Sequence, residues 1–244
     1  LDEDFLQKAA NFRQIVPVFT NVIFDTSQPH ANVVFPHMFA WLDEVLEIAR
    51  AHPETLFVIR AHPDEQRPGK AARESVRDWA RARGVENLPN VVFVDSQEFL
   101  NSYELIRRAK FVMVYNSTIG LEAVLLGKAV LCAGKARFTQ YPIVFFPRTR
   151  EAFRQQAEEF LTAAGDEIPA PEAFRRNARR FLYYQLYKVS LPFDAFLEDI
   201  PSQRGYVRLK AFPPQTLLPE HSTTMRVLRD GILEGKPLVM PEEV

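Results

Sequence analysis

Three residues near the middle of the chain have side chains suited to holding a phosphate and a sugar. Ser117 and Thr118 carry hydroxyl groups at the start of a predicted helix, where backbone N–H groups favour an anion. Glu122 follows one helical turn later, and its carboxylate can accept hydrogen bonds from ribose hydroxyls. Serine and threonine also cap helices that bind nothing, so this stretch fits a structural role equally well.

A histidine follows another predicted strand. His62 precedes Pro63, and the proline favours an extended backbone at His62. An imidazole there can donate a hydrogen bond to phosphate or act as an acid toward a departing phosphate. A His-Pro pair is also typical of an ordinary loop, and Arg60 beside it can simply pair with Asp64 or Glu65.

More polar residues leave the ends of predicted strands. Asn21 and Asp25 follow the first strand, where Asp25 also fits an Asx turn. Asp95 and Ser96 follow a later strand, where they contact a base or merely turn the chain. The remaining candidates, on either side of the Ser-Thr pair, are Asn116 and Gly120.

Alternating strands and helices position these residues. Apolar patterns predict strands at residues 15–20, 56–60, 91–94, 111–115 and 129–132, with a last short strand ending at 145–146. Helices are predicted at residues 36–51, 71–83, 100–109, 119–126, 149–164, 171–189 and 223–233. The alternation predicts an α/β fold, a Rossmann-like doubly wound parallel sheet. Ligands bind at the carboxyl ends of such strands, so we expect the candidate residues to share one edge.

The chain divides into three predicted parts. Residues 1–14 form a linker helix, residues 15–168 form the Rossmann-like domain, and residues 169–244 form a helical tail. Aromatic residues crowd the tail, which we expect to pack on this domain or on a domain missing from the amino end. The chain begins at Leu1 rather than Met, and we expect an upstream segment.

Composition excludes several classes of protein. The net charge of −1 over 244 residues provides no basic field for nucleic acid. A single cysteine, Cys132, cannot form an internal disulfide, and the five histidines show no metal-binding spacing, so no metal site is predicted. P-loop, GxGxxG and GxSxG motifs are absent from the sequence. With no apolar run of ~20 residues and no signal-peptide pattern, a cytoplasmic location is predicted.

Taken in order, the segments form a recognisable series: FTNVIFD, VIRAHP, VVFVDSQEFLNSYELIRRA and VYNSTIGLEAVLLGKAVLCAG. The series resembles the bacterial capsule polysaccharide biosynthesis proteins, which include Kdo-transferring enzymes. More broadly it resembles the nucleotide-binding half of GT-B glycosyltransferases. The resemblance covers residues 15 to about 142 and is most specific at NSTIGLEAVLLGKAV. The His-Pro pair is also similar to that of bacterial sialyltransferases, where His-Pro and a Ser pair hold the CMP of the donor.

The resemblance implies a role for each candidate. His62, with Ser117 and Thr118, would hold the donor phosphate, and Glu122 would bind the ribose. Gly120 would let the backbone approach the donor, while Asp95 and Ser96 would lie near the base. Asn21 and Asp25 would face the domain cleft. The implied catalytic residues are His62 and Asp25, and the implied donor-binding residues are Asn21, Arg60, Asp95, Ser96, Asn116, Ser117, Thr118, Gly120 and Glu122.

The predicted function is therefore the donor-binding part of a metal-independent glycosyltransferase for capsular or surface polysaccharide. No cofactor is expected, and the donor is a CMP- or UDP-linked sugar, with CMP-Kdo favoured by the resemblance. The acceptor is a saccharide or glycolipid, which suggests peripheral association with the inner face of the membrane. One alternative is a sugar-nucleotide epimerase, for which Asp25 and Glu65 are the available carboxylates. The other is a non-catalytic interaction module.

Overall fold

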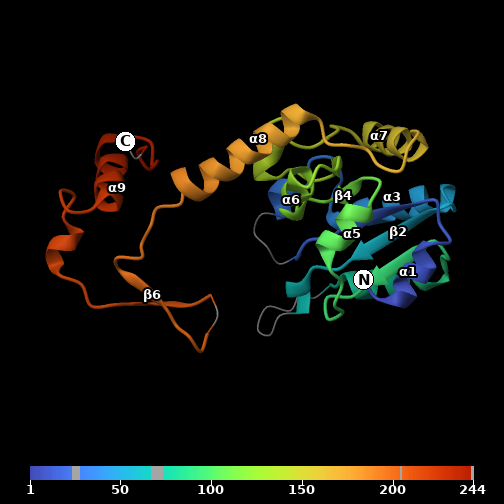
Figure 1. Ribbon diagram of the computed structural model, residues 1–244, viewed down its shortest axis with the longest axis horizontal. Helices are drawn as coiled ribbons and strands as arrows, with labels where there is room; N and C mark the ends of the chain where they lie inside the picture. The colour runs from blue at the N-terminus through green and yellow to red at the C-terminus, as the bar shows by residue number, and fades with distance from the viewer. Residues whose placement is uncertain (24–27, 67–73, 204, 243–244) are drawn as a thin grey trace. The chain divides into compact units, whose positions relative to one another are not determined.

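The computed structural model of the protein describes residues 1–23, 28–66, 74–203 and 205–242 (Figure 1). Contacts within the chain divide it into two compact units, Leu1–Ala178 and Arg179–Val244. The first unit holds all the candidate residues of the sheet edge. One of them, Asp25, lies outside the described residues.

A five-stranded parallel sheet forms the centre of the first unit. Its strands are β1 (Gln14–Phe19), β2 (Thr55–Arg60), β3 (Val91–Val94), β4 (Val112–Val114) and β5 (Val130–Cys132), in the order β3-β2-β1-β4-β5. Short apolar runs rich in valine form these strands because both faces of the sheet are covered. The strand order reverses between β1 and β4, which confirms the predicted Rossmann-like doubly wound α/β fold.

Helices cover both faces of the sheet (Figure 1). The helices of the first unit are α1 (Glu3–Ala9), α2 (Gln28–Ala31), α3 (Met38–Ala51), α4 (Val76–Ala82), α5 (Ser102–Arg108), α6 (Ile119–Leu125) and α7 (Arg150–Thr162). Met113 and Leu131 share one buried cluster with residues of α3 and α7. Val114 and Val130 lie against α6. Neighbouring residues of a strand point to opposite faces, so α6 lies across the sheet from α3 and α7.

Helix α3 shows how the sequence fixes this packing. Apolar residues recur at helical spacing along it, and Trp41, Leu42 and Val45 are fully buried. The side chain of His37 caps its first turn by accepting a hydrogen bond from the N–H of Ala40 at 3.0 Å. The ring of Trp41 packs on Tyr115 at the end of β4, with the ring centroids 5.6 Å apart. Helix α3 therefore packs against the sheet at the carboxyl end of β4.

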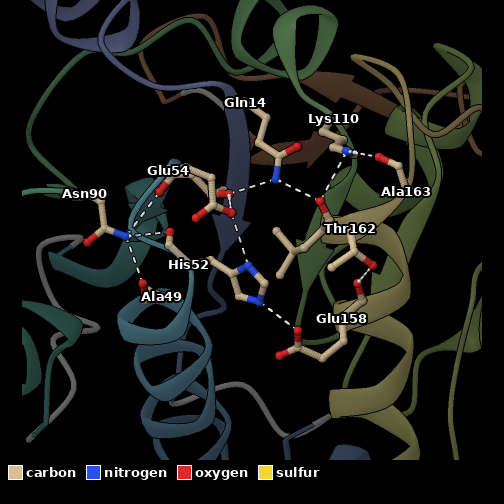
Figure 2. A network of polar contacts seen from close by, with 11 residues as sticks. Gln14, Ala49, His52, Glu54, Asn90, Lys110, Glu158, Thr162 and Ala163 are labelled. Atoms are coloured by element: carbon tan, nitrogen blue, oxygen red, sulfur yellow. Dashed lines mark hydrogen bonds and ion pairs between the residues drawn. The ribbon is translucent and has the colours of Figure 1, made fainter.

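A polar network joins α7 to the amino ends of β1 and β2 (Figure 2). The ammonium of Lys110 is buried and donates to the carbonyl oxygens of Ala163 at 2.7 Å and Leu161 at 3.3 Å. Gln14 donates to Leu161 as well, at 3.1 Å, and His52 contacts Glu158 at 2.7 Å. The network lies at the edge of the sheet opposite the candidate residues, so its role is to stabilise the fold.

We expect Lys110→Met to lower the free energy of unfolding by about 1–3 kcal/mol, because the carbonyl oxygen of Ala163 loses its donor and that of Leu161 keeps only the one from Gln14. Burial lowers the pKa of Lys110 but leaves its hydrogen-bonding role intact. Urea unfolding followed by circular dichroism measures the difference. The exposed Lys8→Met serves as the control and is expected to change stability by less than about 0.5 kcal/mol. Equal values for both variants would contradict a structural role for Lys110.

Two predicted elements differ from the structure. The short strand expected to end at residues 145–146 is only an isolated bridge between Phe145 and Leu131. The tail, expected to be helical, also contains an antiparallel pair of strands, β6 (Leu197–Asp199) and β7 (Val207–Leu209). These strands are mostly exposed and carry charged residues, so they lack the apolar pattern by which strands are predicted.

The rest of the tail is helical or irregular. Helix α8 (Glu172–Tyr183) crosses the boundary of the two units and continues as a short π-helix, Tyr184–Lys188. Helix α9 (Thr223–Glu234) follows later. Several large apolar side chains of the second unit are exposed, among them Tyr183, Tyr187, Leu209, Ile232 and Leu233.

Candidate functional site

The five strands end in register, so the residues that follow them form a row. Phe19 at the end of β1 pairs with Arg60 of β2 on one side and Val114 of β4 on the other. Arg60 pairs in turn with Val94, and Val114 with Cys132. Neighbouring strands lie about 4.8 Å apart, so side chains that leave β1 and β4 are close together while those that leave β3 are farther away.

Polar groups meet at the point where the strand order reverses. The side-chain oxygen of Asn21, after β1, accepts a hydrogen bond from the backbone N–H of Asn116, after β4, at 3.2 Å. The side chain of Asn116 donates to the carbonyl of Lys135, after β5, at 3.5 Å. The loops after three strands are thus joined at the place where open α/β sheets bind ligands. Lys135, an exposed cation at this edge, was not among the residues predicted from the sequence.

The Ser-Thr pair differs in part from its prediction. Thr118 is exposed and its side chain accepts no capping hydrogen bond, so the expected cap is wrong for this residue. The N–H of Gly120 donates to the carbonyl of Ser117 at 3.1 Å, and the N–H of Leu121 to that of Thr118 at 2.9 Å. Both N–H groups are therefore already hydrogen-bonded within the turn. Because α6 has only seven residues, its dipole adds little, and the two hydroxyls are what this stretch offers a ligand.

Gly120 has a packing role. A Cβ atom at this position would lie 3.1 Å from Cγ2 of Val114 and 3.4 Å from Cγ1 of Val130. The glycine therefore allows α6 to pack closely against β4 and β5. Its N–H is occupied within the turn, and a donor contact through the Gly120 backbone stays a prediction.

Glu122 is half-buried and has a partner from another helix. The hydroxyl of Tyr103 on α5 donates to its Oε2 at 2.5 Å. The side chain of Asn101 accepts hydrogen bonds from the N–H groups of Tyr103 and Glu104, both at 3.1 Å. The hydrogen bond to Glu122 raises the pKa of Tyr103, which keeps the phenol protonated as a donor. No local sequence pattern predicts this pair, because its members are 19 positions apart.

Three residues at or after the end of β2 take different positions. His62 is half-buried, and its Nδ1 accepts a hydrogen bond from the N–H of Asp64 at 3.1 Å. Arg60 is buried and donates to the carbonyl of Glu98 at 3.2 Å, and its burial lowers its pKa. Glu65 lies in the 3₁₀ turn Pro63–Gln66 and is only 1% exposed.

The carboxylate of Glu65 serves α4 rather than the sheet edge. Its Oε1 accepts a hydrogen bond from the N–H of Val76 at 2.8 Å. Burial raises the pKa of Glu65. A carboxylate used in this way is a poor acid or base for an epimerase, and Asp25, the other carboxylate considered for that reaction, lies outside the described residues.

Asp95 and Ser96 follow β3, the edge strand, two strands away from β1. Oδ1 of Asp95 accepts the N–H of Ser96 at 2.6 Å and its hydroxyl at 3.2 Å, while Oδ2 pairs with Arg77 of α4. Together with Lys8 and Arg81, Asp95 and Arg77 line a cavity of about 600 Å³ beside β3. The two residues share the edge with the other candidates, but the structure does not bring them to the point of reversal.

Within the described ranges, the His, Cys, Asp and Glu side chains form no group of three or more arranged to hold a metal ion. In the same part of the chain, no helix combines the length and the apolar character required to cross a membrane.

Fold and site together define a Rossmann-like α/β protein with polar residues at the reversal point of its sheet. The chain belongs to the capsule polysaccharide biosynthesis protein family, whose model matches residues 3–159. Protein FixF of Sinorhizobium fredii (strain NBRC 101917 / NGR234) is 32% identical over 107 residues. That match covers 44% of this chain and 23% of FixF, so the chain spans less than a quarter of this relative.

Solved structures with a similar fold are more distant. A UDP-GlcNAc 2-epimerase from Neisseria meningitidis bound to UDP-GlcNAc is 16% identical with a TM-score of 0.47, over 75% of this chain and 47% of the epimerase. KpsC of Thermosulfurimonas dismutans, a beta Kdo 2,7 transferase, is 19% identical with a TM-score of 0.38, over 75% of this chain and 64% of KpsC. The chain therefore spans about half to two-thirds of the length of these proteins.

Proposed function

We propose that this chain is the donor-binding part of a glycosyltransferase that uses a nucleotide-activated sugar to build capsular or surface polysaccharide. The main support for the proposal is the hydrogen bond between Asn21 and Asn116 at the reversal point of the sheet, in a chain of the capsule polysaccharide biosynthesis family. Glu122 lies in the helix after the same loop. The reversal point of the strand order is where doubly wound folds hold nucleotides.

The transfer breaks the bond between the anomeric carbon of the sugar and the donor phosphate, and forms one to an acceptor oxygen. The acceptor's proton passes to a general base, and negative charge develops on the leaving phosphate. We assign the stabilisation of that charge to His62 and the hydroxyls of Ser117 and Thr118. The transfer then needs neither a metal ion nor a cofactor. Glu122 fixes the ribose and so orients the donor.

Other parts of the proposal extend beyond the residues of the sheet edge. The donor is CMP- or UDP-linked, and the acceptor is a saccharide or glycolipid. We place the acceptor and the general base on another domain of the GT-B type, with the protein at the cytoplasmic face of the membrane. Because the chain spans only part of the proteins it matches, these partners belong to the whole protein.

Calorimetric titration of the chain with CMP, UDP and GDP tests the proposal. We expect one nucleotide to bind, and His62→Ala to weaken that binding by roughly 2- to 10-fold through the loss of one hydrogen bond to phosphate. His221→Ala, an exposed histidine of the second unit, is the matched control and should bind as the wild type does.

The outcome also separates the alternatives. If none of the three nucleotides binds, the donor-binding assignment fails and the interaction module becomes the better account. If UDP binds and the chain interconverts a UDP-sugar with its epimer, the epimerase is correct, although the position of Glu65 argues against it.

A further inference from the structure

Two aromatic side chains are exposed in the segment that leads from β3 into α5. Tyr103 has so far been described only as the partner of Glu122, and Phe99 has no role in the site. Tyr103 in the first turn of α5 is 48% exposed, and Phe99 in the loop before it is 91% exposed. Both lie in the segment that leaves the carboxyl end of β3 and enters the helix packed beside β1. Rings so exposed are accessible to a ligand.

The ring of Tyr103 is held in place at both ends. At its backbone end, Asn101 caps the helix by accepting the N–H of Tyr103 at 3.1 Å. At its far end, the hydroxyl donates to Glu122 at 2.5 Å. Leu105 and Ile106, which follow on the same helix, are fully buried and anchor it to the sheet. The ring therefore keeps a fixed orientation without being covered.

The preceding loop is also held. Arg60 donates to the carbonyl of Glu98 at 3.2 Å, and Leu100 is buried. Phe99 lies between these two attachments, so its side chain is presented outward and not packed into the core. A single exposed aromatic residue is ordinary on a protein surface. Two in one fixed segment, one of them bonded to a ribose-binding candidate, call for an explanation.

We propose that Tyr103 is the platform on which the nucleotide base stacks, with Phe99 extending the apolar surface beside it. This inference rests on the proposed function, because it takes Glu122 as the residue that binds the ribose. The base is bonded directly to the ribose. A nucleotide whose ribose contacts Glu122 therefore brings its base beside the ring whose hydroxyl touches the same carboxylate.

Stacking of this kind suits the chemistry of the site. Every base has an aromatic face, and stacking on a tyrosine or phenylalanine ring gives affinity without reading the edge of the base. The platform would therefore bind cytosine and uracil alike. Discrimination between them would come from groups that form hydrogen bonds with the base edge.

Comparison of a nucleotide with a ligand that lacks the base tests the proposal. CMP, UDP and ribose 5-phosphate are titrated into the wild type, Tyr103→Ala and Tyr103→Phe. We expect Tyr103→Ala to weaken the nucleotide that binds by about 5- to 150-fold and to leave ribose 5-phosphate within about threefold. Tyr103→Phe keeps the ring and is expected to bind the nucleotide within about tenfold of the wild type, having lost only one hydrogen bond.

Tyr206→Ala, which removes another exposed tyrosine in the second unit, is the control and should change nothing. If Tyr103→Ala weakens ribose 5-phosphate as much as the nucleotide, Tyr103 only positions Glu122 and the stacking proposal is wrong. If it weakens neither, the ring has no part in binding. A wild type that binds ribose 5-phosphate but no nucleotide also overturns the platform. A wild type that binds none of the three ligands overturns the proposed function itself.

Discussion

The Glu122→Ala variant is expected to bind its nucleotide about 10- to 100-fold more weakly than the wild type, while its fold stays intact. Hydrogen bonds to a charged group contribute about 1.5–3 kcal/mol, and the ribose hydroxyls would lose their acceptor. Glu122 is half-buried, and the partner it leaves behind, the hydroxyl of Tyr103, belongs to a side chain that is 48% exposed. Water can satisfy that hydroxyl, so little stability is lost.

Calorimetry measures the affinity, and thermal unfolding checks the fold. Glu122→Gln retains one acceptor oxygen, so its affinity is expected to fall between those of the wild type and Glu122→Ala. Glu104→Ala is the matched control, because it removes a carboxylate from the neighbouring helix α5. An equal loss in Glu104→Ala would mean that the effect is general electrostatics and would refute the ribose contact.

The double variant Arg150→Ala/Arg154→Ala is expected to lose about 3–5 kcal/mol of its free energy of unfolding. Glu44 on α3 is completely buried, and both arginines of α7 pair with its carboxylate. Removal of both leaves a buried charge without a partner. Each single variant leaves the other arginine in place, so its loss should be much smaller, and the double loss should exceed the sum of the two single losses.

A third substitution tests the cause. In the triple variant Glu44→Met/Arg150→Ala/Arg154→Ala no charge is buried, and most of the lost stability should return, because an apolar side chain of similar volume can replace a buried ion pair at little cost. Urea unfolding gives all the values. Two outcomes would show that the arginines stabilise α7 by packing and not by compensating the charge of Glu44. In one, the stability losses of the two single variants add up to that of the double variant. In the other, the triple variant is no more stable than the double variant.

The class of fold, the position of most elements and the family could all be predicted from the amino-acid sequence. Strand–helix alternation is a local property, because an apolar run or a helical period is visible within a dozen residues. The polar residues that follow the strands were visible in the same way. The stretch Asn116–Glu122 was recognisable because its residue types and spacing are specific, and the family match includes it.

Which of those residues lie in contact depends on the tertiary packing of the chain. Asn21 and Asn116 are 95 positions apart, and Tyr103 and Glu122 are 19 apart, so no local pattern connects them. Strand order puts the end of β3 two strands from β1, which is why Asp95 pairs with Arg77 away from the reversal point.

Gly120 is a further case, because its role depends on how closely α6 packs on the sheet. Such meetings follow from sheet order and register, which arise when distant segments pack, and a sequence read in local windows does not contain them. The chemistry of the site was therefore visible in the types of its residues, while its geometry came from the way the sheet is assembled.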